Sequence, residues 1–369
     1  MSPTVKPAGI GLIGAGNISS QYLKAAKFFP ILDVRGIADI NPEAAKARGA
    51  EFGVPAMTVA ELLADPSVEI VVNLTIPKAH VEVGLQAIAA GKHVHSEKPL
   101  GVTVAEGRKL IAAAAKKGVR VGGAPDTFLG GAHQTCRKLI DEGAIGQVIG
   151  GIAFFGTPGH ERWHPNPAFY YQPGGGPVLD MGPYYITALV NLLGPVKRVA
   201  AITATPRKTR TITSQPLNGK KMQVRVATHA SGTLEFASGA VVTVVLSFDI
   251  PRYRHPPIEI YGTTGSLGVP DPNWFDGEIL IASATEDWKA VPIQHGHAEH
   301  NLRVMAVAEM AQAIRKRRPH RASGELAFHV LEVMEAFQRS SDTARTVKIA
   351  SQPKRPKMLP TSLKTGEFD

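Results

Sequence analysis

Residues 10–122 alternate short strand-like segments with segments of helical pattern, and this alternation constrains the fold more than any other feature. The segments that predict strands are residues 10–13, 32–38, 69–74, 93–96 and 120–122, of which 10–13 and 69–74 are apolar runs. Strands that alternate with helices of this length form βαβ units, and right-handed crossovers then give a doubly wound parallel sheet. The sequence therefore predicts an α/β fold with an N-terminal domain over residues 1–126.

The pattern changes after Asp126, and residues 127–369 predict a second domain. Its expected strands are residues 147–155, 196–204, 223–236, 240–248 and 257–261, and its expected helices are residues 131–142, 178–193, 300–316 and 325–339. Ala237, Ser238 and Gly239 separate two strands as a hairpin turn would. Because one face of the strand after this turn is fully apolar and the other is mixed, we expect an α+β domain with a large, open, mostly antiparallel sheet.

A glycine turn, Gly14-Ala15-Gly16, follows the first strand and opens a helix through Asn17 and Ile18. Gly14 permits a tight turn, and Gly16 allows the backbone to approach a pyrophosphate at the positive end of the helix. A tight turn of this kind needs glycine even without a ligand, so the surrounding sequence decides whether the turn binds a dinucleotide. The order of elements predicts a Rossmann domain that binds a dinucleotide.

Asp39 supplies that context. It lies 25 residues after Gly14 at the end of the second strand, where an acidic residue binds the adenosine ribose hydroxyls. Its carboxylate would repel the 2′-phosphate of NADP, and Ile40 rather than a basic residue follows it. The sequence favours NAD, while Arg35 and Lys46 leave NADP open as the less favoured cofactor.

Lys98 stands in the sequence His95-Ser96-Glu97-Lys98-Pro99, directly after a strand of the parallel sheet. Ligands bind at this edge of such sheets. A lysine beside a positively charged nicotinamide ring has a physical reason for a lowered pKa, because like charges disfavour the ammonium form. We expect Lys98 to exchange a proton with a substrate oxygen; an ordinary surface lysine paired with Glu97 is the alternative.

Several motifs together resemble the glucose–fructose oxidoreductase, inositol dehydrogenase and rhizopine catabolism (Gfo/Idh/MocA) family. The motifs are Gly14-Ala15-Gly16, Asp39, Thr75-Ile76-Pro77-Lys78-Ala79-His80, Glu97-Lys98-Pro99 and the run from Gly174 through Asp180 to Tyr184. They follow one another in the family's order over nearly the whole chain. The resemblance implies an N-terminal Rossmann domain and a C-terminal domain whose open sheet serves oligomerisation, as a homodimer or homotetramer.

The resemblance also assigns roles to individual residues. It implies catalysis by Lys98, Asp180 and Tyr184, with Asp180 orienting the site. Many members carry histidine where this chain has Tyr184, which questions an inositol dehydrogenase-like relay but not the reaction class. Asp180 and Tyr184 are spaced i, i+4 and would share one helical face. The implied cofactor residues are Gly14, Ala15, Gly16, Asn17, Ile18, Asp39, Ile40, Thr75, Ile76, Pro77, His80, Glu97 and Lys98.

The loop before Asp180 is rich in aromatic and polar side chains, which suit a carbohydrate ring. The candidate substrate residues are Arg162, Trp163, His164, Tyr170 and, further along the chain, His255. Arg303 is a weaker candidate. His295, His297 and His300 lack a metal-binding spacing, so we expect a polar loop and no metal.

Composition excludes some classes of protein. The net charge is +10, but no aromatic residues are interleaved with the basic stretches 197–225, 315–321 and 354–357, so nucleic acid is not expected. An anionic ligand for these stretches is left open. There is no signal-like segment or apolar span, and the single cysteine, Cys136, fits a buried position in a cytoplasmic protein.

These observations predict an NAD(P)-dependent oxidoreductase that transfers hydride between nicotinamide and a secondary alcohol or carbonyl of a sugar, polyol or cyclitol. Three alternatives stay open: reduction in the reverse direction, a redox-neutral enzyme that cleaves glycosides with NAD, and a non-enzymatic sensor on the same fold. Retention of Lys98 argues against the sensor, which has no need of a proton-transfer lysine.

Overall fold

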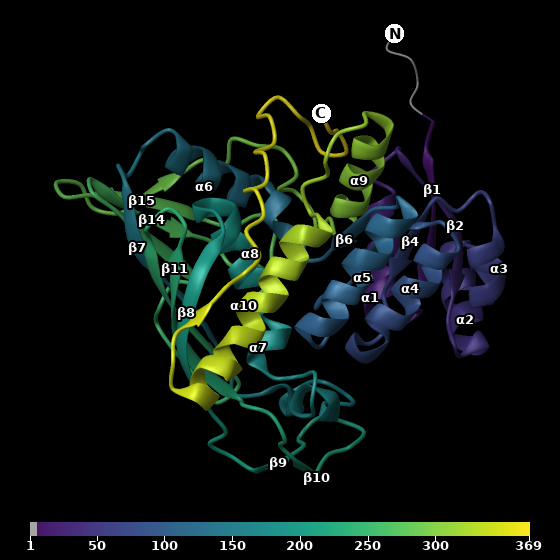
Figure 1. Ribbon diagram of the computed structural model, residues 1–369, viewed down its shortest axis with the longest axis horizontal. Helices are drawn as coiled ribbons and strands as arrows, with labels where there is room; N and C mark the ends of the chain where they lie inside the picture. The colour runs from purple at the N-terminus through teal and green to yellow at the C-terminus, as the bar shows by residue number, and fades with distance from the viewer. Residues whose placement is uncertain (1–5) are drawn as a thin grey trace.

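The computed structural model describes residues 6–369, which form two sheets of different kind (Figure 1). The first sheet is six-stranded and wholly parallel, in the order β3-β2-β1-β4-β5-β6. Its strands are β1 (Ala8–Ile13), β2 (Leu32–Ala38), β3 (Ala56–Met57), β4 (Ile70–Asn73), β5 (His93–Ser96) and β6 (Val121–Gly123). This order has its switch point between β1 and β4, as in a Rossmann domain.

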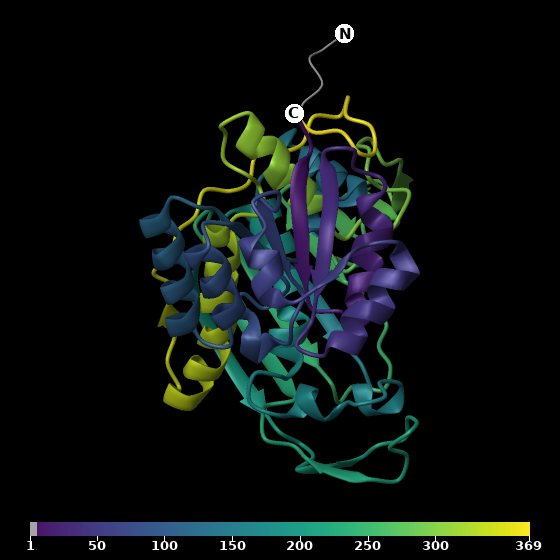
Figure 2. The same cartoon turned by 90° about the vertical axis from the view of Figure 1, so that its right-hand side faces the viewer.

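Helices cover both faces of this sheet, as Figure 2 shows. They are α1 (Asn17–Ala26), α2 (Pro42–Phe52), α3 (Val59–Ala64), α4 (His80–Ala89) and α5 (Val104–Lys117). The start of α2 follows the expected rule, because the Asn41 side chain caps it and Pro42 occupies its first turn. The doubly wound architecture predicted for the N-terminal region is confirmed.

The second sheet has nine strands in the order β16-β15-β14-β13-β7-β12-β11-β8-β17. Its strands are β7 (Val148–Gly156), β8 (Val196–Ala204), β11 (His229–Phe236), β12 (Val241–Ser247), β13 (Ile258–Gly262), β14 (Gly265–Val269), β15 (Ile279–Ser283), β16 (Lys289–Val291) and β17 (Val347–Lys348). All its pairs are antiparallel except that of β7 with β12. The expectation of a large, mostly antiparallel sheet is confirmed.

Helices lie on one face of the second sheet. They are α6 (Gly131–Asp141), α7 (Pro177–Asp180), α8 (Gly182–Leu193) and α10 (Gly324–Thr343), whereas α9 (Met305–Arg315) contacts β4 and β6 of the first sheet. Buried and partly exposed residues alternate along β11, so that its inner side chains pack under the helices. Helix α10 runs between the two sheets and contacts β8 on one side and α5 and β6 on the other (Figure 1).

Three expected elements have different bounds in the structure. The expected helix 178–193 breaks at Met181 into α7 and α8, because Pro183 cannot continue a helix from the preceding turn. The expected strand 223–236 is divided between β10 (Lys221–Gln223) and β11. Helix α9 begins at Met305 rather than at residue 300, after Val304 with its left-handed φ of 113°.

Strand β10 pairs with β9 (Thr209–Thr211) in a separate hairpin that projects at the bottom of Figure 1. Its residues Ile212 and Met222 form a small second core with Tyr171, Val224 and Phe248. Cys136 is buried on α6, as expected. No helix among residues 6–369 is both long and apolar enough to cross a membrane.

Candidate active site

The glycine turn lies between β1 and α1 and leaves the start of the helix open. Gly14 has a φ of 111°, and a Cβ there would lie 2.6 Å from the Leu74 carbonyl, so only glycine fits. Nothing lies within 4 Å of a Cβ built on Gly16, and no side chain caps α1. The first amides of α1 therefore face open space, which suits a pyrophosphate.

Asp39 ends β2 beside this turn. One carboxylate oxygen accepts a hydrogen bond from the Ala15 amide at 2.7 Å, and the other accepts one from the Asn41 amide at 2.8 Å. The two basic residues that left NADP open are engaged elsewhere, because Arg35 pairs with Asp33 and Lys46 pairs with Glu43. The Asp39 carboxylate is thus oriented by the glycine turn itself.

Arg48 is a neighbour of the glycine turn that no sequence pattern reveals. Arg48 of α2 reaches back to the Gly16 carbonyl at 3.4 Å, and its Nε atom is buried without a partner. Ile40 and Ile76, on the loops after β2 and β4, are 97% and 69% exposed. Two isoleucines this exposed at the carboxyl edge of the sheet offer apolar surface to the flat rings of a ligand.

His80 joins the loop after β4 to the loop after β5. Its Nδ1 lies 2.7 Å from the Pro99 carbonyl oxygen and its Nε2 lies 2.9 Å from that of Thr75. Burial lowers the pKa of His80 although both carbonyls act in the opposite direction. His80 is therefore buried behind the site, where it holds Thr75 and the cis Lys98–Pro99 segment in place.

Glu97 does not pair with the Lys98 ammonium group. Its carboxylate accepts hydrogen bonds from the Tyr22 hydroxyl of α1 at 2.8 Å and from the Lys98 amide at 2.9 Å. Glu97 thus ties the Lys98 backbone to the helix that the glycine turn opens. The alternative of a surface lysine paired with Glu97 is wrong.

Lys98 crosses from the Rossmann domain to Asp180 at the end of α7. Its Nζ donates to the Asp180 carboxylate at 2.9 Å and to the Asp180 carbonyl at 3.0 Å. Burial acts to lower the pKa of Lys98, but the charges of Asp180, Tyr184 and Glu97 together with the Asp180 hydrogen bond outweigh burial, and the net shift is upward. The protein's own groups therefore keep Lys98 as an ammonium ion, and the lowering expected beside a nicotinamide ring stays a prediction.

His160 occupies the other oxygen of Asp180, with its Nε2 at 2.9 Å. Its Nδ1 lies 3.3 Å from the Trp163 indole nitrogen, which can only donate. Nδ1 is therefore the acceptor, and Nε2 carries the proton that Asp180 accepts. His160 belonged to the predicted aromatic loop but was not singled out, because no spacing links it to Asp180.

Tyr184 lies on the next helix, α8, so it does not share a continuous helix with Asp180 as expected. Its ring centroid is 5.0 Å from Lys98 Nζ. Arg303 is a second cation near Tyr184: burial acts to lower the pKa of Arg303, but Tyr184, Asp126 and Glu97 raise it overall. Tyr184 thus has two cationic neighbours in spite of the helix break.

Aromatic residues of the loop 160–171 form a wall beside these groups. The Tyr170 ring is 4.3 Å from that of His160, and burial together with Asp180 raises the Tyr170 pKa. His164 packs against Trp163 and Tyr170 at 5.3 and 5.4 Å, while Trp163 is 61% exposed. Arg162 is exposed on the same loop.

Not every candidate joins this cluster. His255 packs against Phe154 at 4.8 Å, and Phe154 points away from the sheet face on which the adjacent Phe155 meets Tyr185 of α8. His255 therefore lies on the outer face of the second sheet. His295 and His297 are buried and His300 stacks on Phe28; among residues 6–369 no three His, Cys, Asp or Glu side chains are grouped as metal ligands.

The fold and this site define an NAD-binding oxidoreductase, and comparisons with known proteins give its family. Residues 8–123 match the oxidoreductase family with an NAD-binding Rossmann fold, and residues 133–268 match the GFO/IDH/MocA C-terminal domain. The chain belongs to the Gfo/Idh/MocA oxidoreductases, as its motifs predicted.

Its relatives include dehydrogenases and reductases of sugars. It is 30% identical to 1,5-anhydro-D-fructose reductase of Ensifer adhaerens over 264 residues, 70% of this chain and 74% of that one. It is 25% identical to D-xylose dehydrogenase of Paenarthrobacter nicotinovorans over 359 residues, 91% and 90% of the two chains. The structure of levoglucosan dehydrogenase with NADH superposes with a TM-score of 0.82, at 22% identity over 94% of this chain and 100% of that one.

Proposed function

We propose that this oxidoreductase transfers hydride between NAD and a secondary alcohol or carbonyl of a sugar, polyol or cyclitol, with Lys98 as the proton-transfer residue. The observation that carries the proposal is the Lys98–Asp180–His160 chain, which joins the two domains at the carboxyl edge of the parallel sheet. The names of the relatives support the substrate class, because they include a reductase and a dehydrogenase of sugars.

The residues around the glycine turn fit NAD. The open start of α1 would hold the pyrophosphate, and Asp39 would accept hydrogen bonds from the ribose hydroxyls. We propose Gly14, Ala15, Gly16, Asn17, Ile18, Asp39, Ile40, Thr75, Ile76 and Pro77 as the residues that line the cofactor, with His80 and Glu97 supporting them from behind. When bound, NAD supplies the hydride acceptor.

The protein's own groups handle the proton and the substrate. Lys98 Nζ holds a proton, and Asp180 keeps that group in one position by two hydrogen bonds. In reduction Lys98 gives this proton to the carbonyl oxygen, and in oxidation Lys98 first releases its proton to solvent and then receives the hydroxyl proton as an amine. Tyr184, whose ring lies beside Lys98, assists this proton transfer with its hydroxyl group. Trp163, His164 and Tyr170 cover the sugar ring, with Arg162 at the mouth of the site.

A panel of polyols, sugars and cyclitols tests the function. We expect the absorbance of reduced nicotinamide to rise with at least one substrate and NAD. Conversion of a glycoside without net change in NADH would instead favour the redox-neutral alternative. Tight sugar and NAD binding with no turnover of any kind would favour a sensor.

We predict that Asp39→Ser weakens NAD binding by about tenfold to a hundredfold, because a charge-assisted hydrogen bond contributes about 1.5–3 kcal/mol. Serine also removes the charge that repels a 2′-phosphate, so the ratio of the NADP and NAD dissociation constants should fall. Fluorescence titration of both cofactors measures the two effects. Asp33→Ser is the matched control, since Asp33 lies on the same strand but pairs with exposed Arg35; equal losses in both variants would refute the role of Asp39.

We also propose a homodimer or homotetramer that forms through the outer face of the second sheet. Ile149, Val241 and Ile202 on these strands are 57%, 47% and 75% exposed, which is unusual for large apolar side chains on a sheet. Ile202→Glu should therefore lower the mass measured by light scattering to that of a smaller assembly. A wild-type protein that is monomeric at micromolar concentration would contradict this proposal.

A further inference from the structure

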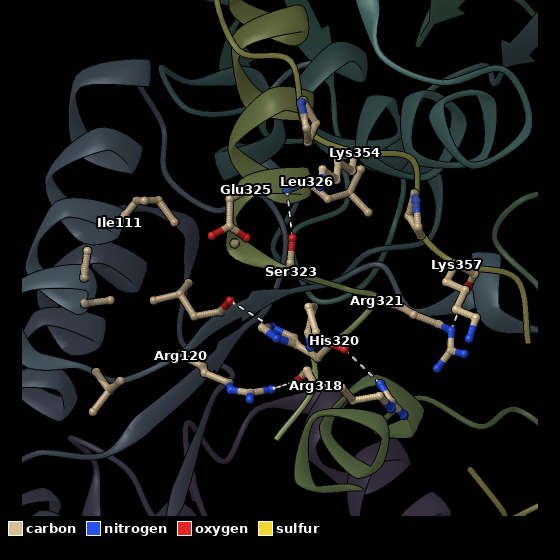
Figure 3. Close-up of a pocket in the computed structure, with 18 of the residues that line it drawn as sticks. Ile111, Arg120, Arg318, His320, Arg321, Ser323, Glu325, Leu326, Lys354 and Lys357 are labelled. Atoms are coloured by element: carbon tan, nitrogen blue, oxygen red, sulfur yellow. Dashed lines mark hydrogen bonds between the residues drawn. The ribbon is translucent and has the colours of Figure 1, made fainter. Parts of the chain in front are cut away.

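A cavity lies away from Lys98, and basic residues surround it (Figure 3). Its volume is about 910 Å3, within the range of small-molecule sites. Two basic stretches of the sequence that the proposed function leaves unexplained, 315–321 and 354–357, contribute residues to its wall. They meet there with the start of α10 and with Arg120 of the Rossmann domain.

The wall carries far more positive than negative charge. It contains one acidic residue, Glu325, and seven lysines and arginines: Arg120, Arg317, Arg318, Arg321, Lys354, Arg355 and Lys357. Glu309 and Asp369 pair with Arg318 and Arg321.

Within the described part of the chain, four of the seven cations have no acidic partner. Within residues 6–369, no ion pair involves Arg120, Arg317, Lys354 or Lys357. A concave surface lined by unpaired charges of one sign concentrates ions of the opposite sign.

Like charges also act on individual residues of the wall. Burial lowers the pKa of Arg120, Glu309 acts in the opposite direction, and the neighbouring Arg318 lowers it further. Burial lowers the pKa of Arg355 to about 10, with Arg137 acting in the same direction. His320 Nε2 donates to the Val121 carbonyl oxygen at 3.0 Å. Burial lowers the pKa of His320, Glu309 acts in the opposite direction, and Arg120 adds to the lowering. An anion in the cavity would reverse each of these effects of like charge.

The position of the cavity separates it from the dinucleotide site. Val119, Arg120 and Val121 line it at the beginning of β6, whereas Gly14, Asp39 and Lys98 all follow the ends of their strands. The cavity and the glycine turn therefore lie at opposite edges of the parallel sheet. A ligand here would contact the Rossmann domain through Arg120 and the rest of the chain through Lys354 and Lys357.

We propose that this cavity binds a small phosphate-bearing molecule. Guanidinium and ammonium groups together suit the several oxygens of a phosphate, and the positive end of the α10 dipole adds to their attraction. The concave shape favours a small molecule over the extended backbone of a nucleic acid.

Calorimetric titration of the NAD-saturated protein tests the proposal, with inorganic phosphate and pyrophosphate as probes at constant ionic strength. Saturation with NAD keeps the probes out of the glycine turn. We expect saturable binding, tighter for pyrophosphate, that weakens at least tenfold in Lys354→Gln/Lys357→Gln. Both lysines are exposed and neither donates a side-chain hydrogen bond within residues 6–369, so the fold should tolerate their replacement.

Lys109→Gln/Lys348→Gln is the matched control, because it removes the same charge from exposed positions outside the cavity. Equal weakening in both double variants would show general charge attraction and overturn the proposal. The absence of saturable binding to the wild-type protein would overturn it as well. A response to duplex DNA without one to phosphate or pyrophosphate would replace the small molecule by a nucleic acid. None of these outcomes depends on turnover, so the proposed function is tested separately.

Discussion

Lys98→Met is expected to lower turnover by about a hundredfold to ten-thousandfold, the range that a positioned proton donor or acceptor contributes. Methionine keeps the length of the side chain but cannot hold a proton. NAD affinity should change little, because the glycine turn and Asp39 are built from other segments. Steady-state turnover with a substrate found in the panel and cofactor titration by fluorescence measure the two quantities.

The buried Asp180 carboxylate complicates this variant, since it loses one of its two side-chain partners. A carboxylate that has lost its cationic partner destabilises a fold, so the double variant Lys98→Met/Asp180→Asn removes the charge. We expect the double variant to unfold like the wild-type protein and to remain as inactive as Lys98→Met. Lys109→Met, at an exposed position of α5, should keep full turnover. If Lys98→Met retained most of its turnover, the proposed proton-transfer role would be abandoned.

Residues that follow strands of the parallel sheet could be predicted from the sequence. Gly14, Asp39 and Lys98 each follow the end of a predicted strand, and the carboxyl ends of parallel strands lie at one edge of the sheet. Local sequence therefore determines both their elements and their shared location. Asp180 was found through a glycine-rich motif, in which Gly174 and Gly176 have φ values of 93° and 90°.

Residues that meet through loops could not be predicted in this way. His160 reaches Asp180 because the loop around it is held by contacts with the distant β9–β10 hairpin, and no sequence spacing encodes those contacts. The break between α7 and α8 did have a local signal, Gly182-Pro183, which the i, i+4 argument overlooked. His255 was misplaced because one-residue alternation along β7 decides which face Phe154, and hence His255, occupies.

The anchor of the His160 loop is the buried guanidinium of Arg210 on β9. Its side chain is 1% exposed, and it pairs with Glu161 at 2.7 Å and with Asp249. It also lies over the Tyr171 ring at 4.9 Å, and the Tyr171 hydroxyl accepts the His160 amide at 3.0 Å while donating to Glu161. The hairpin thus holds the backbone of the residue that orients Asp180.

Arg210→Met is therefore expected to destabilise the protein by about 3–5 kcal/mol, because it leaves Glu161 and Asp249 buried without their shared cation. Turnover should fall at a temperature where the variant remains folded, since His160 loses its fixed position. Urea unfolding followed by tryptophan fluorescence measures the stability, and Trp163 reports on the loop itself.

Arg207→Met provides the matched control on the same segment. Arg207 also pairs with Asp249, at 2.9 Å, but its side chain is 50% exposed. Solvent screens such a pair, so its loss should cost only about 0–1 kcal/mol and leave turnover unchanged. Equal destabilisation by the two substitutions would mean that the burial of Arg210 adds nothing to the stability that its ion pairs give the protein. A stable Arg210→Met variant with full turnover would show that the hairpin does not position His160.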